Sequence, residues 1–296
     1  MDWDDLRLFL AVARRESLSG AGQALRLDPA TVGRRIARLE RACGAALFAR
    51  SPQGYALTEA GQRLLPHAEQ AEQAARAAQD TLRGTGGGLT GQIRIGAPDG
   101  CATYLLPQVL AAVCDANPGL EVQIVALPRV FNLSKREADL AIAVSRPEAG
   151  RLTAQKLTDY RLHLAASVDY LSRHPAIGAA ADLRGHRLVG YIPDMIHDKQ
   201  LDYLAETGVG EATLASNAVP VQIAWLRAGA GIGLVHDFAL PSAPGLVRVL
   251  PEAVSLRRAF WLIRHESDAR TGRLARFAAL LGDGLRREVA RLEALA

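Results

Sequence analysis

Arginines gathered on one predicted helix are the residues of this chain with the clearest chemistry. Arg34, Arg35 and Arg38 fall within the segment Asp28 to Cys43, together with Thr31. A guanidinium group can donate paired hydrogen bonds to a guanine edge or bind phosphate, and a threonine methyl can contact thymine. The alternative is a charged helix face that is only solvated. The helix alone does not decide between the two, and the segments around it favour an interface with nucleic acid.

The segment that carries these arginines has the sequence of a well-formed helix. Asp28 is a favourable N-cap, and Pro29 suits the first helical position because its missing N–H would be unpaired there anyway. An apolar stripe follows at intervals of four, three and four residues: Val32, Ile36, Leu39 and Cys43. We expect one face to pack inside the domain and another to stay cationic.

The segments on either side predict the rest of a DNA-binding domain. A short helix is expected at Ala21 to Leu25, and the tight turn after it gives helix-turn-helix spacing. Downstream, residues 47–57 alternate around a turn containing Gly54, which is typical of a β-hairpin, or wing. Arg50 and Gln53 of this wing are expected to contact phosphate or the minor groove.

Further residues of this N-terminal part follow the pattern of a known family. They are Leu6, Phe9, Val12, Ser17-Leu18, Ala24-Leu25, the run from Val32 to Glu40, Gly44, Leu47-Phe48, Arg50 and Leu57-Thr58-x-Ala60-Gly61. In them the chain resembles the LysR-type transcriptional regulators. The family commonly begins its recognition helix with Ser-Gln-Pro, where this chain has Asp28-Pro29-Ala30, and Gly33 stands where the family has serine. Base readout is therefore assigned to Thr31, Arg34 and Arg35. The resemblance implies DNA contacts by Ser17, Ser19, Pro29, Ala30, Thr31, Arg34, Arg35, Arg38, Arg50 and Gln53.

Length, charge and cysteine usage limit the class of protein. The 296 residues are 49% hydrophobic, which predicts two domains with a sizeable core. The net charge is +4, and residues 1–65 contribute ten arginines against seven acidic residues. The acidic start does not resemble a signal peptide, and no apolar run approaches the roughly 18 residues of a membrane helix. Three cysteines without metal spacing favour a reduced, cytoplasmic protein with neither disulfide nor zinc.

The stretch from Thr58 to Arg83 is rich in strong helix formers. Small and apolar residues recur along it every three or four residues: Gly61, Leu64, Ala68, Ala71, Ala75, Ala78 and Leu82. This spacing is typical of a coiled-coil seam, although the helix could instead pack on its own protein. In the family it is the dimerising linker. The following residues 84–90 are glycine-rich and are interpreted as a hinge.

From Gly91 onward short apolar strands alternate with helices, which predicts a parallel α/β arrangement. The helices are expected at 104–115, 131–137, 196–207 and 221–228. Strand-like segments at 161–166 and 258–264 suggest two crossings between two lobes, with a C-terminal helix from Leu274 to Leu292. Motifs in this part resemble the effector domain of the same family and, through it, type 2 periplasmic binding proteins: Gly91-x-Ile93-Arg94-Ile95-Gly96, Leu105-Leu106-Pro107, Asn117-Pro118, residues 136–142 and residues 228–234.

The expected fold is an α/β effector domain of two Rossmann-like lobes, preceded by an all-α winged helix-turn-helix domain. The expected boundaries are 1–58 for the DNA-binding domain, 59–83 for the linker helix, 84–90 for the hinge, 91–162 with 265–296 for lobe I, and 163–264 for lobe II.

Catalysis is the rival function, and the motifs do not favour it. The seven histidines have no metal-ligand spacing, and no GxSxG or SxxK motif occurs. Gly229, Gly231 and Gly233 precede and enter a strand instead of following one into a helix, which is not the dinucleotide-binding order. We expect no enzyme activity, no cofactor and no metal.

A two-lobed module without catalytic residues is expected to bind a small polar effector between its lobes. The loop after the first strand opens the next helix and offers free N–H groups. The expected effector-binding residues are Asp99, Gly100, Cys101, Ala102, Thr103, Arg129, Ser145, Ser216 and Asn217. Cys101 at a helix start could alternatively be a redox switch, although a buried structural thiol is the preferred interpretation.

These observations predict a sequence-specific LysR-type regulator whose response to DNA is altered by an unidentified small molecule. Its expected partners are double-stranded DNA, a second copy bound through the linker helix, two further copies in a homotetramer, and RNA polymerase, with no membrane. The alternative is a redox-sensing or solute-binding intracellular protein without specific DNA recognition.

Overall fold

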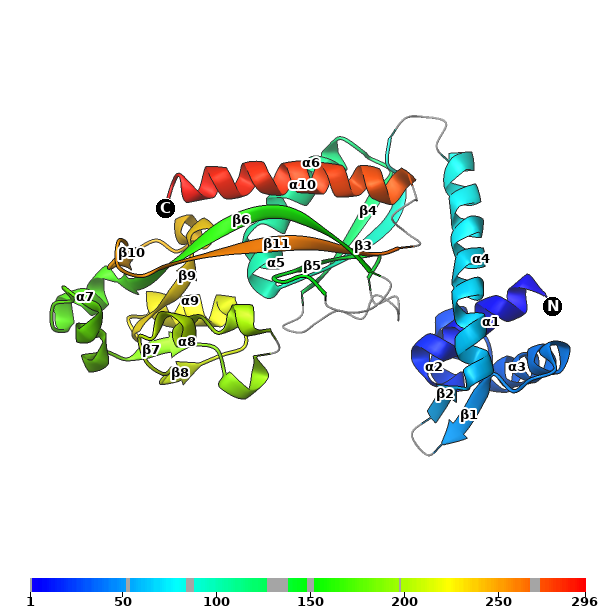
Figure 1. Cartoon of the computed structure of the whole chain (residues 1–296). Helices are drawn as coiled ribbons and strands as arrows, with labels where there is room; N and C mark the ends of the chain where they lie inside the picture. Colours follow the sequence, from blue (N-terminus) through cyan, green and yellow to red (C-terminus); the bar gives the residue numbers. More distant parts are fainter. Residues whose placement is uncertain are drawn as a thin grey trace. The chain divides into compact units, whose positions relative to one another are not determined.

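The computed structural model describes residues 2–51, 54–83, 88–126, 138–147, 152–196, 198–266 and 272–296. The described residues up to Arg83 belong to one compact unit, and those from Gly88 onward belong to another (Figure 1). The predicted helix at 131–137 and residues 84–87 of the predicted hinge lie outside the described residues.

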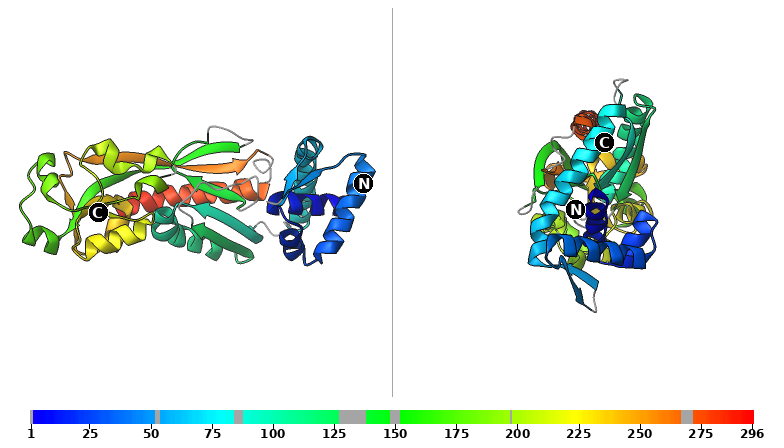
Figure 2. Two further views of the ribbon diagram at one scale, coloured as in Figure 1. Left: turned by 90° about the horizontal axis from the view of Figure 1, so that it is seen from below. Right: turned by 90° about the vertical axis from the view of Figure 1, so that its right-hand side faces the viewer.

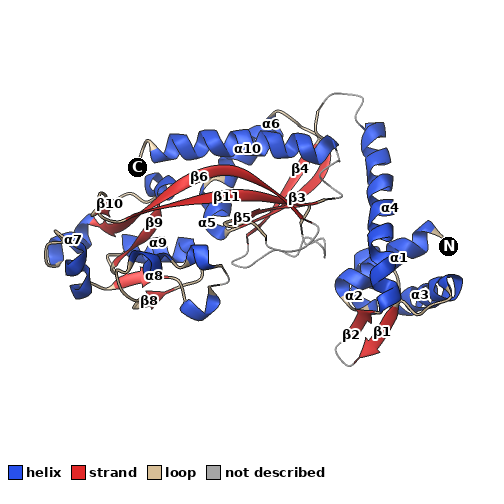
Figure 3. Cartoon of the chain, viewed as in Figure 1, coloured by secondary structure: helices blue, strands red, loops and turns tan. Residues whose placement is uncertain are grey.

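The N-terminal unit packs helices around a small core and carries one hairpin (Figure 3). Val32, Ile36 and Leu39 are buried in this core, as their spacing predicts. Cys43 is exposed, so its place in the predicted stripe is wrong, because it ends the helix just before the chain turns at Gly44. The helix-turn-helix and wing are confirmed. The elements are α1 Trp3–Arg15, α2 Leu18–Leu25, α3 Pro29–Cys43, β1 Phe48–Ser51, β2 Gly54–Leu57 and α4 Glu59–Arg83.

Local hydrogen bonds fix where α3 ends and the wing begins. The Asp28 carboxylate accepts from the backbone N–H of Thr31 at 3.0 Å, as expected of the N-cap. Gly44 ends the helix at φ +66°, a conformation that favours glycine. Glu40 accepts from the N–H groups of Leu47 and Phe48 at 2.8 and 3.2 Å, and so joins α3 to β1.

The start of α4 is clamped to the wing. Thr58 donates its hydroxyl to the Ala46 carbonyl at 2.7 Å and accepts from the N–H of Gly61 at 3.1 Å. A Cβ on Gly61 would lie 2.2 Å from the Leu47 carbonyl oxygen, so this approach requires glycine. The Leu57-Thr58-x-Ala60-Gly61 motif is thus explained by close packing.

The first half of α4 packs on its own domain. Ala68 is fully buried in the N-terminal core, and Leu64 packs against that core. Glu72 receives two hydrogen bonds from the Arg14 guanidinium of α1, at 3.1 and 2.7 Å. The expected dimer seam is therefore partly used within the subunit.

The C-terminal unit is built on one curled sheet. Among the described residues it has nine strands in the order β4-β3-β5-β11-β6-β9-β7-β8, with β10 paired to β6. Parallel pairs lie toward the two ends, and the antiparallel pair β6–β11 runs through the middle. The strands are β3 Gly91–Ala97, β4 Leu120–Ala126, β5 Leu140–Ala143, β6 Leu152–Ser167, β7 Leu188–Gly190, β8 Leu214–Ala215, β9 Ile232–His236, β10 Leu246–Val249 and β11 Ser255–His265.

Helices cover this sheet and divide it into two lobes. Lobe I surrounds β3–β5 and lobe II surrounds β7–β9, and both share the long strands β6 and β11. Helix α10 lies along β6 and beside α6 (Figures 1 and 2). The predicted two-lobed α/β fold is confirmed, and both predicted crossings lie within β6 and β11. The helices are α5 Asp99–Tyr104, α6 Leu106–Asp115, α7 Val168–Arg173, α8 Tyr203–Thr207, α9 Val219–Arg227 and α10 Gly272–Glu293.

Two helices differ from their predictions. The helix expected over 104–115 is preceded by α5 and separated from it at Leu105, whose ψ of −51° and φ of −118° interrupt the regular path. The helix expected over 196–207 is a 3-10 turn at 199–201 followed by the short α8. Here Asp202 accepts from the N–H of Ala205 at 3.3 Å and starts a new helix. Within the described ranges no helix is long and apolar enough to cross a membrane.

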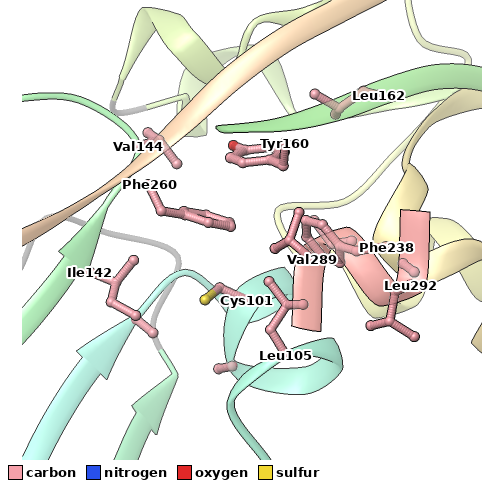
Figure 4. Packing of buried hydrophobic residues seen from close by; sticks show 14 of the residues in the cluster. Cys101, Leu105, Ile142, Val144, Tyr160, Leu162, Phe238, Phe260, Val289 and Leu292 are labelled. Atoms are coloured by element: carbon pink, nitrogen blue, oxygen red, sulfur yellow. The ribbon is translucent and has the colours of Figure 1, made fainter. Parts of the chain in front are cut away.

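Aromatic rings fill the middle of the effector domain, where the two lobes join. Tyr160 of β6 stacks on Phe260 of β11 with ring centroids 4.2 Å apart, and Phe238 meets Tyr160 edge-on at 5.6 Å. Figure 4 shows these rings together with Leu105 of lobe I and Val289 of α10. Residues of both lobes, of β6 and β11 and of α10 thus share one core.

Candidate DNA interface and effector site

The exposed face of α3 presents Arg34 in an ordered position. Its guanidinium donates to the Thr31 hydroxyl at 2.8 Å, and Thr31 is itself bound to the Asp28 carboxylate. Arg34 is exposed. The chain of bonds from the N-cap to Arg34 holds a cation at the start of the helix, the part that meets base edges in a helix-turn-helix.

The other predicted contact residues around α3 differ in their hydrogen bonds and in their exposure. The Ser17 hydroxyl accepts from the N–H of Gly20 at 3.2 Å and so caps α2. Ser19, Pro29 and Ala30 are exposed. These three small residues leave room for close approach of a duplex but supply few polar groups.

Two of the predicted DNA-contacting arginines are engaged by the protein itself. Arg35 donates to the Asp5 carboxylate at 2.8 Å, and Arg38 donates to both Asp5 oxygens at 2.9 and 2.6 Å. Asp5 lies in α1 and is only 3% exposed. Burial alone would raise the pKa of Asp5, but hydrogen bonds and charge from Arg38 and Arg35 outweigh it and lower the pKa.

The wing carries one exposed cation among its described residues. Arg50 is exposed, and its guanidinium lies 5.5 Å from the ring centroid of Tyr55, its cross-strand partner. The ring restricts Arg50 while leaving its N–H groups available. Gln53 lies outside the described residues.

The loop predicted to bind the effector forms a contact between the lobes. Asp99 at the start of α5 accepts from the N–H of Val219, the first residue of α9, at 2.6 Å. Burial raises the pKa of Asp99, against the opposing effect of this bond. Gly100, Cys101 and Ala102 are buried and Thr103 is exposed. Because α5 has only six residues, it offers a weaker anion site than the long helix expected there.

The remaining predicted effector residues are not gathered around one cavity. Ser216 lies near Asp99, but its hydroxyl accepts from the N–H of Ala218 at 3.1 Å. Asn217 beside it is half-buried. Ser145, after β5, donates its hydroxyl to the Asp198 carboxylate of lobe II and forms a second bond between the lobes. Arg129 lies outside the described residues.

A cavity of about 690 Å³ touches both lobes beside the β6–β11 pair. Four of its side chains are cationic and one is a carboxylate. Ser145 links it to the predicted set, but sequence reasoning missed the other members. The available signal was Arg258 and Trp261 on the predicted strand at 258–264, with Arg257 directly before it. The lining residues are Val144, Ser145, Arg146, Lys156, Asp159, Gln200, Arg257, Arg258, Ala259 and Trp261.

The cations of this cavity are unequally neutralised. Lys156 and Arg257 share the single carboxylate of Asp159, at 2.7 and 2.8 Å. Arg258 pairs with Glu206 of α8. The guanidinium of Arg146 lies 5.4 Å from the ring centroid of Trp261, and no carboxylate among the described residues pairs with it. The cavity therefore carries an excess of positive charge.

Sequence analysis also did not predict that His236, a buried histidine near the lobe junction, belongs to a cluster of rings. His236 lies among the rings of Tyr160, Tyr203 and Phe238. Burial lowers the pKa of His236 to about 3, so the ring is neutral near pH 7. A Cβ on Gly100 would lie 3.6 Å from this ring, so His236 packs against the start of α5. Its role in the fold is packing between lobes.

Two family models match the chain. Residues 3–62 match the bacterial regulatory helix-turn-helix protein of the lysR family, and residues 86–286 match the LysR substrate binding domain. The chain belongs to the LysR family. It is a LysR-type transcriptional regulator with an effector-binding domain, and it is not an enzyme.

Individual relatives of this LysR-type regulator span nearly the same length. The HTH-type transcriptional regulator DmlR of Escherichia coli strain K12 is 30% identical, over 84% of this chain and 83% of the relative. The probable hydrogen peroxide-inducible genes activator of Mycobacterium avium is 29% identical, over 94% and 92%. A solved Corynebacterium glutamicum OxyR mutant with hydrogen peroxide bound has 25% identity and a TM-score of 0.58, covering 99% and 97%. A Pseudomonas aeruginosa OxyR structure, at 18% identity and a TM-score of 0.72 over 96% and 94%, shares the fold.

The environment of Cys101 does not favour redox sensing by this regulator. Its side chain is 1% exposed, and Figure 4 shows the sulfur among buried residues that include Phe260 and Leu105. Burial raises the pKa of the thiol, which suppresses the reactive thiolate.

We therefore expect Cys101→Ala to leave the DNA-binding response to hydrogen peroxide unchanged, as measured by gel shift before and after oxidation. Exposed Cys43, replaced in the same way, is the matched control for oxidation elsewhere. Loss of a peroxide response in the Cys101 variant alone would restore the redox alternative.

Proposed function

We propose that this LysR-type regulator senses a small anionic metabolite in the cation-lined cavity and transmits its presence to DNA contacts made by α3 and the wing. The observation that carries this proposal is the unneutralised positive charge of a cavity lined by both lobes. The DNA contacts are assigned to Thr31 and Arg34 of α3 and to Arg50 of the wing.

The chemistry of the lining supports an anion with an apolar body. Arg146 has donor groups without a carboxylate partner among the described residues, and guanidinium groups match carboxylate or phosphate geometry. Trp261 supplies a flat apolar wall. The volume of about 690 Å³ lies within the range of small-molecule sites. A carboxylate or phosphate ester of modest size fits this combination.

The position of the cavity supports a regulatory role. Ser145 and Arg146 belong to lobe I and Gln200 belongs to lobe II, so an occupant contacts both. Opening the lobes would separate these contacts and break the Ser145–Asp198 bond. A ligand that binds the closed arrangement more tightly shifts the population toward it, in proportion to its differential affinity.

Assembly and location complete the proposal. The part of α4 after Glu72 is assigned to the dimer contact, because the turns up to Glu72 already pack on their own domain and bond to α1. A homotetramer in the cytoplasm that contacts double-stranded DNA and RNA polymerase is the expected working form. The domain boundaries predicted from the sequence stay predictions.

We expect benzoate, succinate or inorganic phosphate to raise the melting temperature of the wild-type protein at constant ionic strength, with agmatine as a cationic probe that has no effect. Arg146→Gln should weaken anion binding by about tenfold or more, since a charge-assisted hydrogen bond is lost. Isothermal calorimetry measures the change.

Arg94→Gln is the matched control, because Arg94 is an exposed lobe I arginine outside the cavity, bound to Gln123. Equal anion affinity in wild type, Arg146→Gln and Arg94→Gln would place the effector elsewhere. Stabilisation by agmatine instead of the anions would reverse the assigned ligand charge.

A further inference from the structure

We propose that Asp5 is a specificity-determining residue that withholds Arg35 and Arg38 of α3 from DNA phosphate. The inference rests on the proposed role of α3 as the DNA-contacting helix. It assigns to an acidic residue of α1 a function in DNA recognition that its position outside the recognition helix does not suggest.

The contacts of Asp5 occupy both of its oxygens. Oδ1 accepts from Arg35 Nε at 2.8 Å and from Arg38 Nη2 at 2.6 Å, while Oδ2 accepts from Arg38 Nε at 2.9 Å. The Asp5 side chain is 4% exposed. Asp2 lies more loosely against both guanidinium groups, at 3.9 and 3.5 Å, and Asp4 lies 3.3 Å from Arg35 only. Asp5 is the buried centre of the cluster, and the other two acids are peripheral.

A DNA phosphate would compete with Asp5 for the same donors. Carboxylate and phosphate both accept paired hydrogen bonds from guanidinium. The Arg38 side chain is half exposed and that of Arg35 about one quarter exposed, so solvent or DNA can reach both guanidinium groups. For either arginine to turn to phosphate, it must leave a buried carboxylate with fewer partners, which is costly. Asp5 therefore holds both arginines in place.

This arrangement reduces the positive charge that α3 offers to any DNA sequence. Arg34 and Arg41 remain on the helix without an acidic partner among the described residues: Arg34 bonds Thr31, and Arg41 bonds the Ala37 carbonyl. Phosphate contacts strengthen binding to all sequences alike, whereas base contacts discriminate. Withdrawing two phosphate-binding cations while keeping Arg34 raises the ratio of specific to non-specific affinity.

The test compares Asp5→Asn with Asp4→Asn in the full chain. Both variants remove one negative charge from α1, but Asp4 is about half exposed and makes only peripheral contacts. Binding to a random-sequence duplex is titrated over a range of salt, beside a duplex selected from a random library by the wild-type protein.

We expect Asp5→Asn to bind random duplex about tenfold more tightly at low salt. The salt slope, which is the slope of the logarithm of the binding constant against the logarithm of the salt concentration, should be steeper by about 1 to 2, because each phosphate neutralised adds about 0.9. The specificity ratio should fall, and Asp4→Asn should stay near wild type. Adding Arg38→Gln to Asp5→Asn should remove about one unit of the gained slope. A purely structural role for Asp5 would lower the melting temperature and weaken both duplexes together.

Unchanged or weaker binding to random duplex by folded Asp5→Asn would overturn the proposal. If that variant does not fold, Arg38→Gln in the wild-type background decides: an unchanged salt slope supports the proposal, and a slope reduced by about 1 overturns it. Arg34→Ala in the same assay separates the two hypotheses. If it does not affect the selected duplex, the assignment of α3 fails, whatever Asp5 does.

Discussion

Replacing Arg34 by alanine should lower the affinity for a selected operator by about 10- to 100-fold, since one bidentate base contact is worth about 1–3 kcal/mol. Arg34 is exposed at the start of α3, and its bond to Thr31 at 2.8 Å holds it in place before DNA arrives. Because its position is fixed in advance, little side-chain freedom remains to be lost on binding.

Fluorescence anisotropy with selected and random duplexes measures this effect. The loss should be larger for the selected duplex, because a base contact is sequence-dependent. Arg63→Ala is the control, since Arg63 is an exposed arginine of α4 paired with Glu59 one helical turn away. Superimposable isotherms for wild type and Arg34→Ala would remove Arg34 from the recognition surface.

Replacing Asp237 by alanine should destabilise the effector domain by about 3 kcal/mol, the cost of removing one member of a buried charged cluster. Asp237 is 1% exposed and lies within 2.8 and 3.0 Å of His163 Nδ1. It also accepts from Arg248 of β10 at 2.9 Å. The carboxylate therefore joins β6, β10 and the end of β9, and its loss leaves Arg248 without this partner.

Urea unfolding followed by circular dichroism tests the expected loss. Asp169→Ala is the matched control, because Asp169 pairs with Arg173 on the exposed face of α7. Such a surface pair contributes only about 0.3–0.5 kcal/mol. Equal midpoints for the two variants would show that the Asp237 cluster adds nothing beyond a surface ion pair.

The sequence by itself determined the N-terminal fold and the class of the protein. Asp28, Pro29 and Gly44 act within one helical turn of themselves, so their effect on α3 is readable without a structure. The buried positions Val32 and Leu39 follow from helical periodicity alone. Alternation of strands and helices likewise predicted a two-lobed α/β domain, and the family motifs named the regulator class.

Only the tertiary structure decided which of the predicted site residues have partners. Asp5 is 30 residues from Arg35, and Asp99 is 120 residues from Val219. Nothing local to Arg35 distinguishes it from Arg34, yet one is bound to a buried carboxylate and the other is exposed.

The cavity shows the same limit of the sequence. Its cations come from segments around residues 146, 156 and 257, which become neighbours only when β6 and β11 pair and β5 joins β11. Helix and strand propensities depend on neighbours within a few residues. Side-chain partners, in contrast, depend on which distant segments burial brings together, and that selection is made by packing of the whole domain.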